Sequence, residues 1–159
     1  MATAASTAVK EEQKTSVKAY YAPVLADLEQ VKASLGEIVP PDSELLVKTI
    51  KHALFSGGKL LRPVVTLLMG RAAMAEGQDH IKALVEVAAV SEMIHIATLL
   101  HDDVLDEADL RRGKTTVRHE WGNTVSVLSG DFLLAQASLK LAHLGIIRLV
   151  AIYSGVLAD

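Results

Sequence analysis

The 159-residue sequence contains no cysteine, few aromatic residues and no excess of positive charge. The absence of cysteine excludes a disulfide framework and a thiolate metal site, and it is compatible with a reducing compartment. Aromatic residues make up 4% of a chain that is 50% hydrophobic, so the core must be built from Ala, Leu, Val and Ile. That composition favours closely packed helices over a β-sandwich. The net charge of −3 argues against a nucleic-acid-binding surface.

The sequence also lacks a long apolar run that is free of polar interruptions. Ile81–Leu100 and Leu141–Ala158 are the longest, and both contain charged residues or histidine, so we expect no membrane span. The N-terminus has no apolar core of a secretory signal. We expect a flexible tail over residues 1–16, a single domain over 17–159 and a cytoplasmic location. A plastid or a mitochondrion is the alternative location, because the tail has the composition of a transit-peptide remnant.

Helical periodicity extends through nearly the whole chain, without an internal repeat or a credible strand alternation. Glycine, proline and capping residues bound the apolar stripes. The predicted helices cover 17–35, a segment from 42 or 43 to the glycines at 57 and 58, about 60–75, 80–106, 117–121, 124–144 and 146–159. A turn is predicted at 76–79 and a loop at Leu110–Thr116. Short connections between these segments predict an all-α bundle of antiparallel neighbouring helices.

The most informative segment is His101–Glu107, where four carboxylates directly follow an apolar helix. Asp102 and Asp106 are four residues apart and stack on one helix face, while Asp103 lies about a quarter-turn away. Two stacked carboxylates can hold Mg²⁺ and leave coordination positions for water and phosphate oxygens. A solvated acidic helix end is the alternative. The helix dipole disfavours acids at a C-terminus, however, and a bound metal removes that conflict.

Candidate phosphate-binding residues lie on both sides of this cluster. Arg111 and Arg112 follow it in a glycine-containing loop, and arginine offers paired donors to phosphate. The alternative is that they neutralise neighbouring acids. His95 lies seven residues before Asp102, within about 20° of the same face. It can donate a hydrogen bond to a second phosphate, or it is a satisfied core histidine.

A second basic segment, Ser56–Pro63, precedes a predicted helix. Its two glycines let the backbone approach an anion, and Lys59 and Arg62 share a helix face. The segment is not a Walker P-loop, because the required glycine and lysine spacing is absent. Taken alone, this motif is better explained as a helix stop with surface cations.

Together these residues resemble the trans-polyprenyl diphosphate synthases, the family of farnesyl, geranylgeranyl, octaprenyl and solanesyl diphosphate synthases. The matching motifs, in family order and spacing, are residues 57–63, 92–106, 111–113 and 130–133. The resemblance covers about Ala22–Leu144, with Leu60 standing where the family usually has a basic residue. It implies an all-α isoprenoid-synthase fold. It also implies Mg²⁺-dependent head-to-tail condensation of isopentenyl diphosphate with an allylic prenyl diphosphate.

The resemblance also assigns roles to individual residues, carried over from the family. Isopentenyl diphosphate would be bound by Lys59, Arg62, His95 and Arg112, while Arg111 would grip the allylic diphosphate as a second substrate-binding residue. Asp102 and Asp106 would hold Mg²⁺, and the catalytic set would be Asp102, Asp103, Asp106 and Arg111. A homodimer or a heterodimer is expected.

The resemblance also allows a prediction of the length of the prenyl product. Short-chain members of the family place bulky aromatic residues shortly before the acidic cluster, whereas this chain has Ala97 and Thr98 there. The growing product would run back along this helix, so small side chains favour a long product. The alternative is that they merely permit close helix packing.

Family members are about twice as long and carry a second aspartate-rich motif, which this chain does not contain. We therefore interpret the chain as the N-terminal half of such a synthase and expect the polypeptide alone to be inactive. A non-catalytic partner subunit that modulates a full-length synthase is the main alternative. A plain helical scaffold with an acidic patch is a third interpretation.

Overall fold

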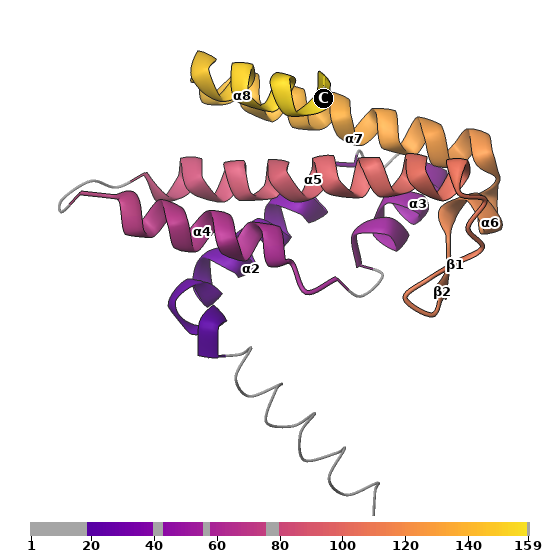
Figure 1. Ribbon diagram of the computed structural model, residues 1–159, viewed down its shortest axis with the longest axis horizontal. Helices are drawn as coiled ribbons and strands as arrows, with labels where there is room; N and C mark the ends of the chain where they lie inside the picture. Colours follow the sequence, from indigo (N-terminus) through magenta and orange to yellow (C-terminus); the bar gives the residue numbers. More distant parts are fainter. Residues whose placement is uncertain (1–18, 40–42, 56–57, 76–79, 159) are drawn as a thin grey trace, which may run out of the picture.

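A computed structural model describes residues 19–39, 43–55, 58–75 and 80–158 (Figure 1). The helical elements are η1 (Ala22–Val24), α2 (Leu25–Gly36), α3 (Glu44–Phe55), α4 (Leu61–Ala73), α5 (Ile81–Leu105), α6 (Val117–Trp121), α7 (Asn123–Leu144) and α8 (Ile147–Ala158). The strands β1 (Leu110–Arg111) and β2 (Lys114–Thr115) form one short antiparallel hairpin. The all-α prediction is confirmed.

Helix α5 is the centre of the bundle. It lies between α4 and α7, and α8 folds back along α7 (Figure 1). Its buried residues cover most of the helix circumference, as expected for a helix that others pack against on several sides, and one face remains open. Small residues allow close approach: a Cβ at Gly130 of α7 would stand 2.3 Å from the His101 ring, and one at Gly70 of α4 would stand 2.2 Å from Leu84. This close packing fixes the position of the acidic end of α5.

Polar contacts tie the outer helices to this frame. Arg71 of α4 donates two hydrogen bonds to the buried Asp27 of α2. Lys140 of α7 donates to Glu86 of α5 at 2.6 Å and to Ser34 of α2 at 2.9 Å. These pairs satisfy charged groups that would be costly to bury alone.

The observed helices agree with the predicted segments to within a few residues, with two corrections. The predicted helix 17–35 is interrupted by the 3-10 turn η1, because Pro23 has no N–H to donate to the preceding turn. The predicted loop Leu110–Thr116 contains the β1–β2 hairpin, which is too short to show strand alternation in the sequence. The predicted tail at 1–16, the residues at 42, 56 and 57, and the turn at 76–79 lie outside the described residues.

Two helices, α5 and α7, are long and apolar enough to cross a membrane by length and composition alone. A core helix of a globular protein meets the same criteria, and 56% of the apolar window of α5 is buried inside the bundle. The expectation of no membrane span therefore stays a prediction.

Candidate functional site

Two adjacent faces of α5 carry the candidate residues. Helical spacing places Glu92, Ile96, Leu99 and Asp103 on one face, and these four side chains line one small cavity of about 50 Å³. The second face carries His95, Thr98, Asp102 and Asp106, at spacings of three or four residues. The candidate site is built where these faces meet the β1–β2 hairpin and the start of α4.

Asp102 and Asp106 are exposed, and neither forms an ion pair with a described residue. The backbone N–H of Asp106 donates to the Asp102 carbonyl at 2.8 Å, which closes the last turn of α5. The two carboxylates therefore stand one turn apart at the exposed helix end, as the sequence predicts. Within the described residues, no cluster of three potential ligands surrounds a metal position. Mg²⁺ commonly binds through one or two carboxylates together with water and substrate oxygens, so these residues fit that metal.

Asp103 has a different environment from its neighbours in the motif. Its side chain is 6% exposed, and its Oδ1 accepts from the Nε and Nη2 of Arg111 at 2.8 and 2.7 Å. The prediction grouped Asp103 with the catalytic carboxylates and gave Arg111 to the diphosphate. The structure pairs the two residues with each other, because Asp103 points toward the hairpin.

The hairpin orients Arg112 separately from Arg111. Arg112 and Gly113 form its two-residue turn, with φ of 53° and 77°. Two positive φ values are those of the hairpin turn that matches strand twist. A non-glycine residue in this region is strained, and such strain is concentrated at functional sites. Sequence analysis missed the hairpin because Arg-Gly is a weaker turn signal than Asn-Gly or Asp-Gly.

The basic residues converge on one cavity. Lys59, Arg62, His95 and Arg112 line a space of about 380 Å³ together with Glu92 and the backbone of Gly58. Gly58 leaves room for the arginine head group, because a Cβ at this residue would stand 3.2 Å from Nη1 of Arg112. Four predicted diphosphate-binding residues from α4, its preceding loop, α5 and the hairpin thus meet at one place.

His95 is neutral in this environment. Burial, with the charges of Arg62, Arg112 and Arg111, lowers the pKa of His95 to about 4, although Asp102 opposes the shift. A neutral imidazole still has one N–H to donate. The Oγ1 of Thr98 donates to the backbone carbonyl of His95 at 2.8 Å, and His95 itself lines the cavity.

Glu92 is the site residue that sequence analysis missed. It is 5% exposed and lines both cavities. Desolvation raises the pKa of Glu92, while the charges of Arg62 and Arg112 lower it. Its sequence signal was its position one turn before His95, at the start of the matching motif 92–106, but the resemblance assigned it no role.

The structure separates the two predicted chain-length residues. Ala97 is fully buried, and Thr98 is exposed on the face of α5 that carries Asp102. Only Thr98 therefore lies beside the acidic end in a position open to a ligand.

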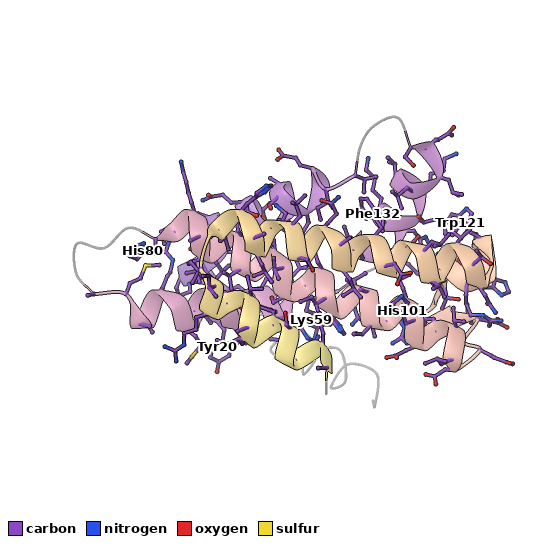
Figure 2. The ribbon with its side chains drawn as sticks, turned by 90° about the horizontal axis from the view of Figure 1, so that it is seen from above. Tyr20, Lys59, His80, His101, Trp121 and Phe132 are labelled. Carbon is purple, nitrogen blue, oxygen red and sulfur yellow. The ribbon has the colours of Figure 1, made fainter. Side chains whose placement is uncertain are left out.

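The segment Gly130–Asp131 on α7 belongs to a helix contact. Nε2 of His101 lies 3.2 Å from the Val127 carbonyl and 3.4 Å from the Asp131 carboxylate, above the space that Gly130 leaves open. Figure 2 shows His101 toward the end of the bundle that holds Trp121, and His80 at the opposite end. This contact anchors the acidic end of α5 to α7.

Comparison with known proteins gives consistent matches. Residues 43–159 match the polyprenyl synthetase family model. The chain is 40% identical over 128 residues to the octaprenyl diphosphate synthase of Escherichia coli, which covers 80% of this chain and 38% of that protein. It is 39% identical over 129 residues to heptaprenyl diphosphate synthase component 2 of Geobacillus stearothermophilus, covering 81% of this chain and 39% of that protein.

A solved structure agrees with these sequence matches. The Caulobacter crescentus polyprenyl synthase, complexed with calcium and isoprenyl diphosphate, is similar with a TM-score of 0.79 and 36% identity, over 87% of this chain and 41% of that chain. The chain spans well under half the length of both curated relatives named above. The family model covers most of the chain and includes the acidic, arginine and glycine motifs. The protein therefore belongs to the polyprenyl synthetase family.

Proposed function

We propose that this chain provides the diphosphate-binding and metal-binding surface of a trans-prenyltransferase. The reaction is the condensation of isopentenyl diphosphate with an allylic prenyl diphosphate, and the product is long. The observation that carries the proposal is the cavity of about 380 Å³ in which Lys59, Arg62, His95 and Arg112 meet beside the exposed Asp102 and Asp106.

The cavity has the chemistry that a diphosphate requires. Lys59, Arg62 and Arg112 supply three cations, and arginine can bind phosphate oxygens with paired donors. His95, neutral when no ligand is bound, supplies a further N–H donor. We assign isopentenyl diphosphate to this cavity.

The allylic diphosphate is assigned to the exposed face with Asp102 and Asp106. These carboxylates would hold Mg²⁺, which stabilises the negative charge that develops on the leaving diphosphate. Arg111 keeps its Nη1 outside the pair with Asp103, so it can donate to the same anion. Exposed Thr98 lies one turn before Asp102 and sets the space for the first part of the product.

The test is direct binding. The 159-residue protein should bind methylenebisphosphonate, and Arg62→Ala combined with Arg112→Ala should weaken that binding by about 10- to 100-fold, as expected for lost charge-assisted hydrogen bonds. Lys48→Ala is the matched control, because Lys48 is an exposed cation paired only with Glu44 among the described residues. Equal loss in the control, or no binding by the folded wild-type protein, would refute the proposal.

A second candidate function is supported by the α8 surface. No residue of α8 is buried, although the helix is strongly apolar, and Ile147, Ile152 and Val156 are exposed. Exposed apolar surface of this kind marks protein contacts. As one component of a two-component prenyl diphosphate synthase, the chain would form a heterodimer. Light scattering of the purified protein tests this: a monodisperse monomer that shows no association with a co-expressed synthase subunit would exclude the subunit role.

A further inference from the structure

Glu92 is a buried carboxylate that lines the same cavity as the cations Lys59, Arg62 and Arg112. Its side chain is 5% exposed, and it forms no hydrogen bond or ion pair with a described residue. No described side-chain polar atom is both fully buried and unpartnered. The carboxylate oxygens of Glu92 are therefore not fully enclosed, and the two cavities that Glu92 lines give them access to solvent or a ligand.

Glu92 and Arg112 both lie close to Gly58. Its Oε1 and the Nη1 of Arg112 lie 3.9 and 3.2 Å from the point where a Cβ of Gly58 would stand. The charges of Arg62 and Arg112 both act on Glu92, yet neither arginine closes on it as an ion pair. The cavity thus keeps a carboxylate and two guanidinium groups around a space that a ligand can enter.

A diphosphate entering this space changes the charge balance around Glu92. The arginines that favour its ionised form would turn to the phosphate oxygens, and the phosphates would add negative charge beside it. Both changes favour the protonated carboxyl group. A protonated carboxyl can donate one hydrogen bond, whereas a carboxylate can only accept.

We propose that Glu92 is a further positioning and binding residue of the diphosphate cavity. It is the counter-charge that offsets the repulsion between Arg62 and Arg112 when no ligand is bound, and it takes up a proton and donates to a phosphate oxygen when a diphosphate binds. This inference rests on the proposed function, because it requires the cavity to bind a diphosphate.

Other titratable groups line the same two cavities as Glu92, and their proton uptake must be distinguished from that of Glu92. They are Lys59 and Arg62 at the start of α4, His95 and Asp103 on α5, Arg111 and Arg112 on the hairpin, and His52 on α3. His95 also gains proton affinity when an anion binds. Its contribution is present in the wild type and in a Glu92 variant, so a comparison of the two cancels it together with the ligand's own titration.

Calorimetric titration of the 159-residue protein with methylenebisphosphonate measures the proton uptake. At about pH 6, 7 and 8, two buffers with different ionisation enthalpies give the number of protons taken up on binding. Glu92→Gln keeps a donor but cannot titrate, so it should bind the ligand with up to about one proton less than wild type. The affinity of wild type for the ligand should fall as the pH rises. The affinity of Glu92→Gln should fall less steeply, and the two slopes should differ by up to about tenfold in affinity per pH unit. Glu37→Gln, an equal charge change at an exposed residue, should behave as wild type.

The outcomes are distinct. Binding by both proteins with equal proton uptake overturns the role of Glu92 and leaves the proposed function intact. No binding by the folded wild type overturns both. If Glu92→Gln does not fold, the carbon-13 shift of the Glu92 carboxyl in the wild type decides: it moves toward the protonated value on ligand addition if the inference holds, and stays unchanged if it is wrong.

Discussion

Asp103 and Arg111 meet through a single carboxylate oxygen, with both Nε and Nη2 of Arg111 within 2.8 Å of Oδ1 of Asp103. This contact ties the last turn of α5 to β1. It divides the acidic motif into a buried residue that holds the hairpin and two exposed residues, Asp102 and Asp106, that remain available to a metal. Neighbouring aspartates in one motif therefore have different physical roles.

The different roles of Asp102 and Asp103 predict different effects of the same substitution. Asp103→Asn removes the charge that partners Arg111 and should lower the free energy of unfolding by about 1–3 kcal/mol. Asp102→Asn should leave it within about 0.5 kcal/mol, because Asp102 is exposed. Urea unfolding of both variants measures the difference, and equal destabilisation would contradict the assignment.

Metal and diphosphate should strengthen each other's binding. Mg²⁺ held by Asp102 and Asp106 would coordinate oxygens of the diphosphate. Each of the two ions then lowers the electrostatic repulsion that opposes binding of the other at this site. Calorimetry with a bisphosphonate should show at least about tenfold tighter binding with Mg²⁺ than with a chelator. Asp102→Asn combined with Asp106→Asn should remove that gain, while Glu29→Gln, an exposed change on α2, should not. Equal affinity with and without Mg²⁺ in a folded sample would refute the prediction.

His95 should make the protein less stable in mild acid. Its pKa is about 4 in the folded chain and about 6.5 when unfolded. The unfolded state therefore binds more protons between these values, and stability falls as the pH drops from about 6.5 to 4. After discounting for screening of the half-buried ring, the loss is about 1–2 kcal/mol.

His95→Gln should flatten this part of the pH profile of stability. Glu92, whose pKa is raised, contributes with the opposite sign in both proteins, so the difference between the two profiles isolates His95. An unchanged slope between about pH 4 and 6.5 would show that burial does not hold His95 neutral.

Ala97→Phe and Thr98→Phe should separate packing from product length. Ala97 is fully buried, so Phe there should cost about 1–3 kcal/mol through overpacking. Thr98 is exposed and should accept Phe with little loss of stability. In a chimera of this chain with the remaining part of the Escherichia coli octaprenyl diphosphate synthase, Thr98→Phe should shorten the product. A chimera that already stops at farnesyl diphosphate, or an unchanged long product in the variant, would refute the product-length prediction.

The 159-residue polypeptide alone should turn over substrates poorly. The described residues provide one acidic face, and a departing diphosphate is best stabilised by cations on more than one side. The exposed apolar surface of α8 should also favour association. Incorporation of labelled isopentenyl diphosphate by pure, monodisperse protein measures this. A rate similar to that of the Escherichia coli relative would contradict the prediction.

The sequence alone determined the helical fold and the arrangement of residues along each helix face. The 3.6-residue spacing of apolar residues places the helices, and the four-residue spacing of Asp102 and Asp106 stacks them on one face whatever surrounds α5. Lys59, Arg62, His95 and Arg112 were selected as candidates by their resemblance to the family motifs, and their phosphate-binding roles stay a prediction.

Tertiary structure decided which partner each charged residue has. The quarter-turn between Asp102 and Asp103 places Asp103 against Arg111. Arg112, at a positive φ, also lines the larger cavity, which Arg111 does not reach. Glu92 became a site residue only because α5 packs against the start of α4 and the hairpin, which bury it among arginines. Spacing along one helix fixes which face a residue occupies. What that face meets depends on contacts between segments that are distant in sequence, and local periodicity carries no information about them.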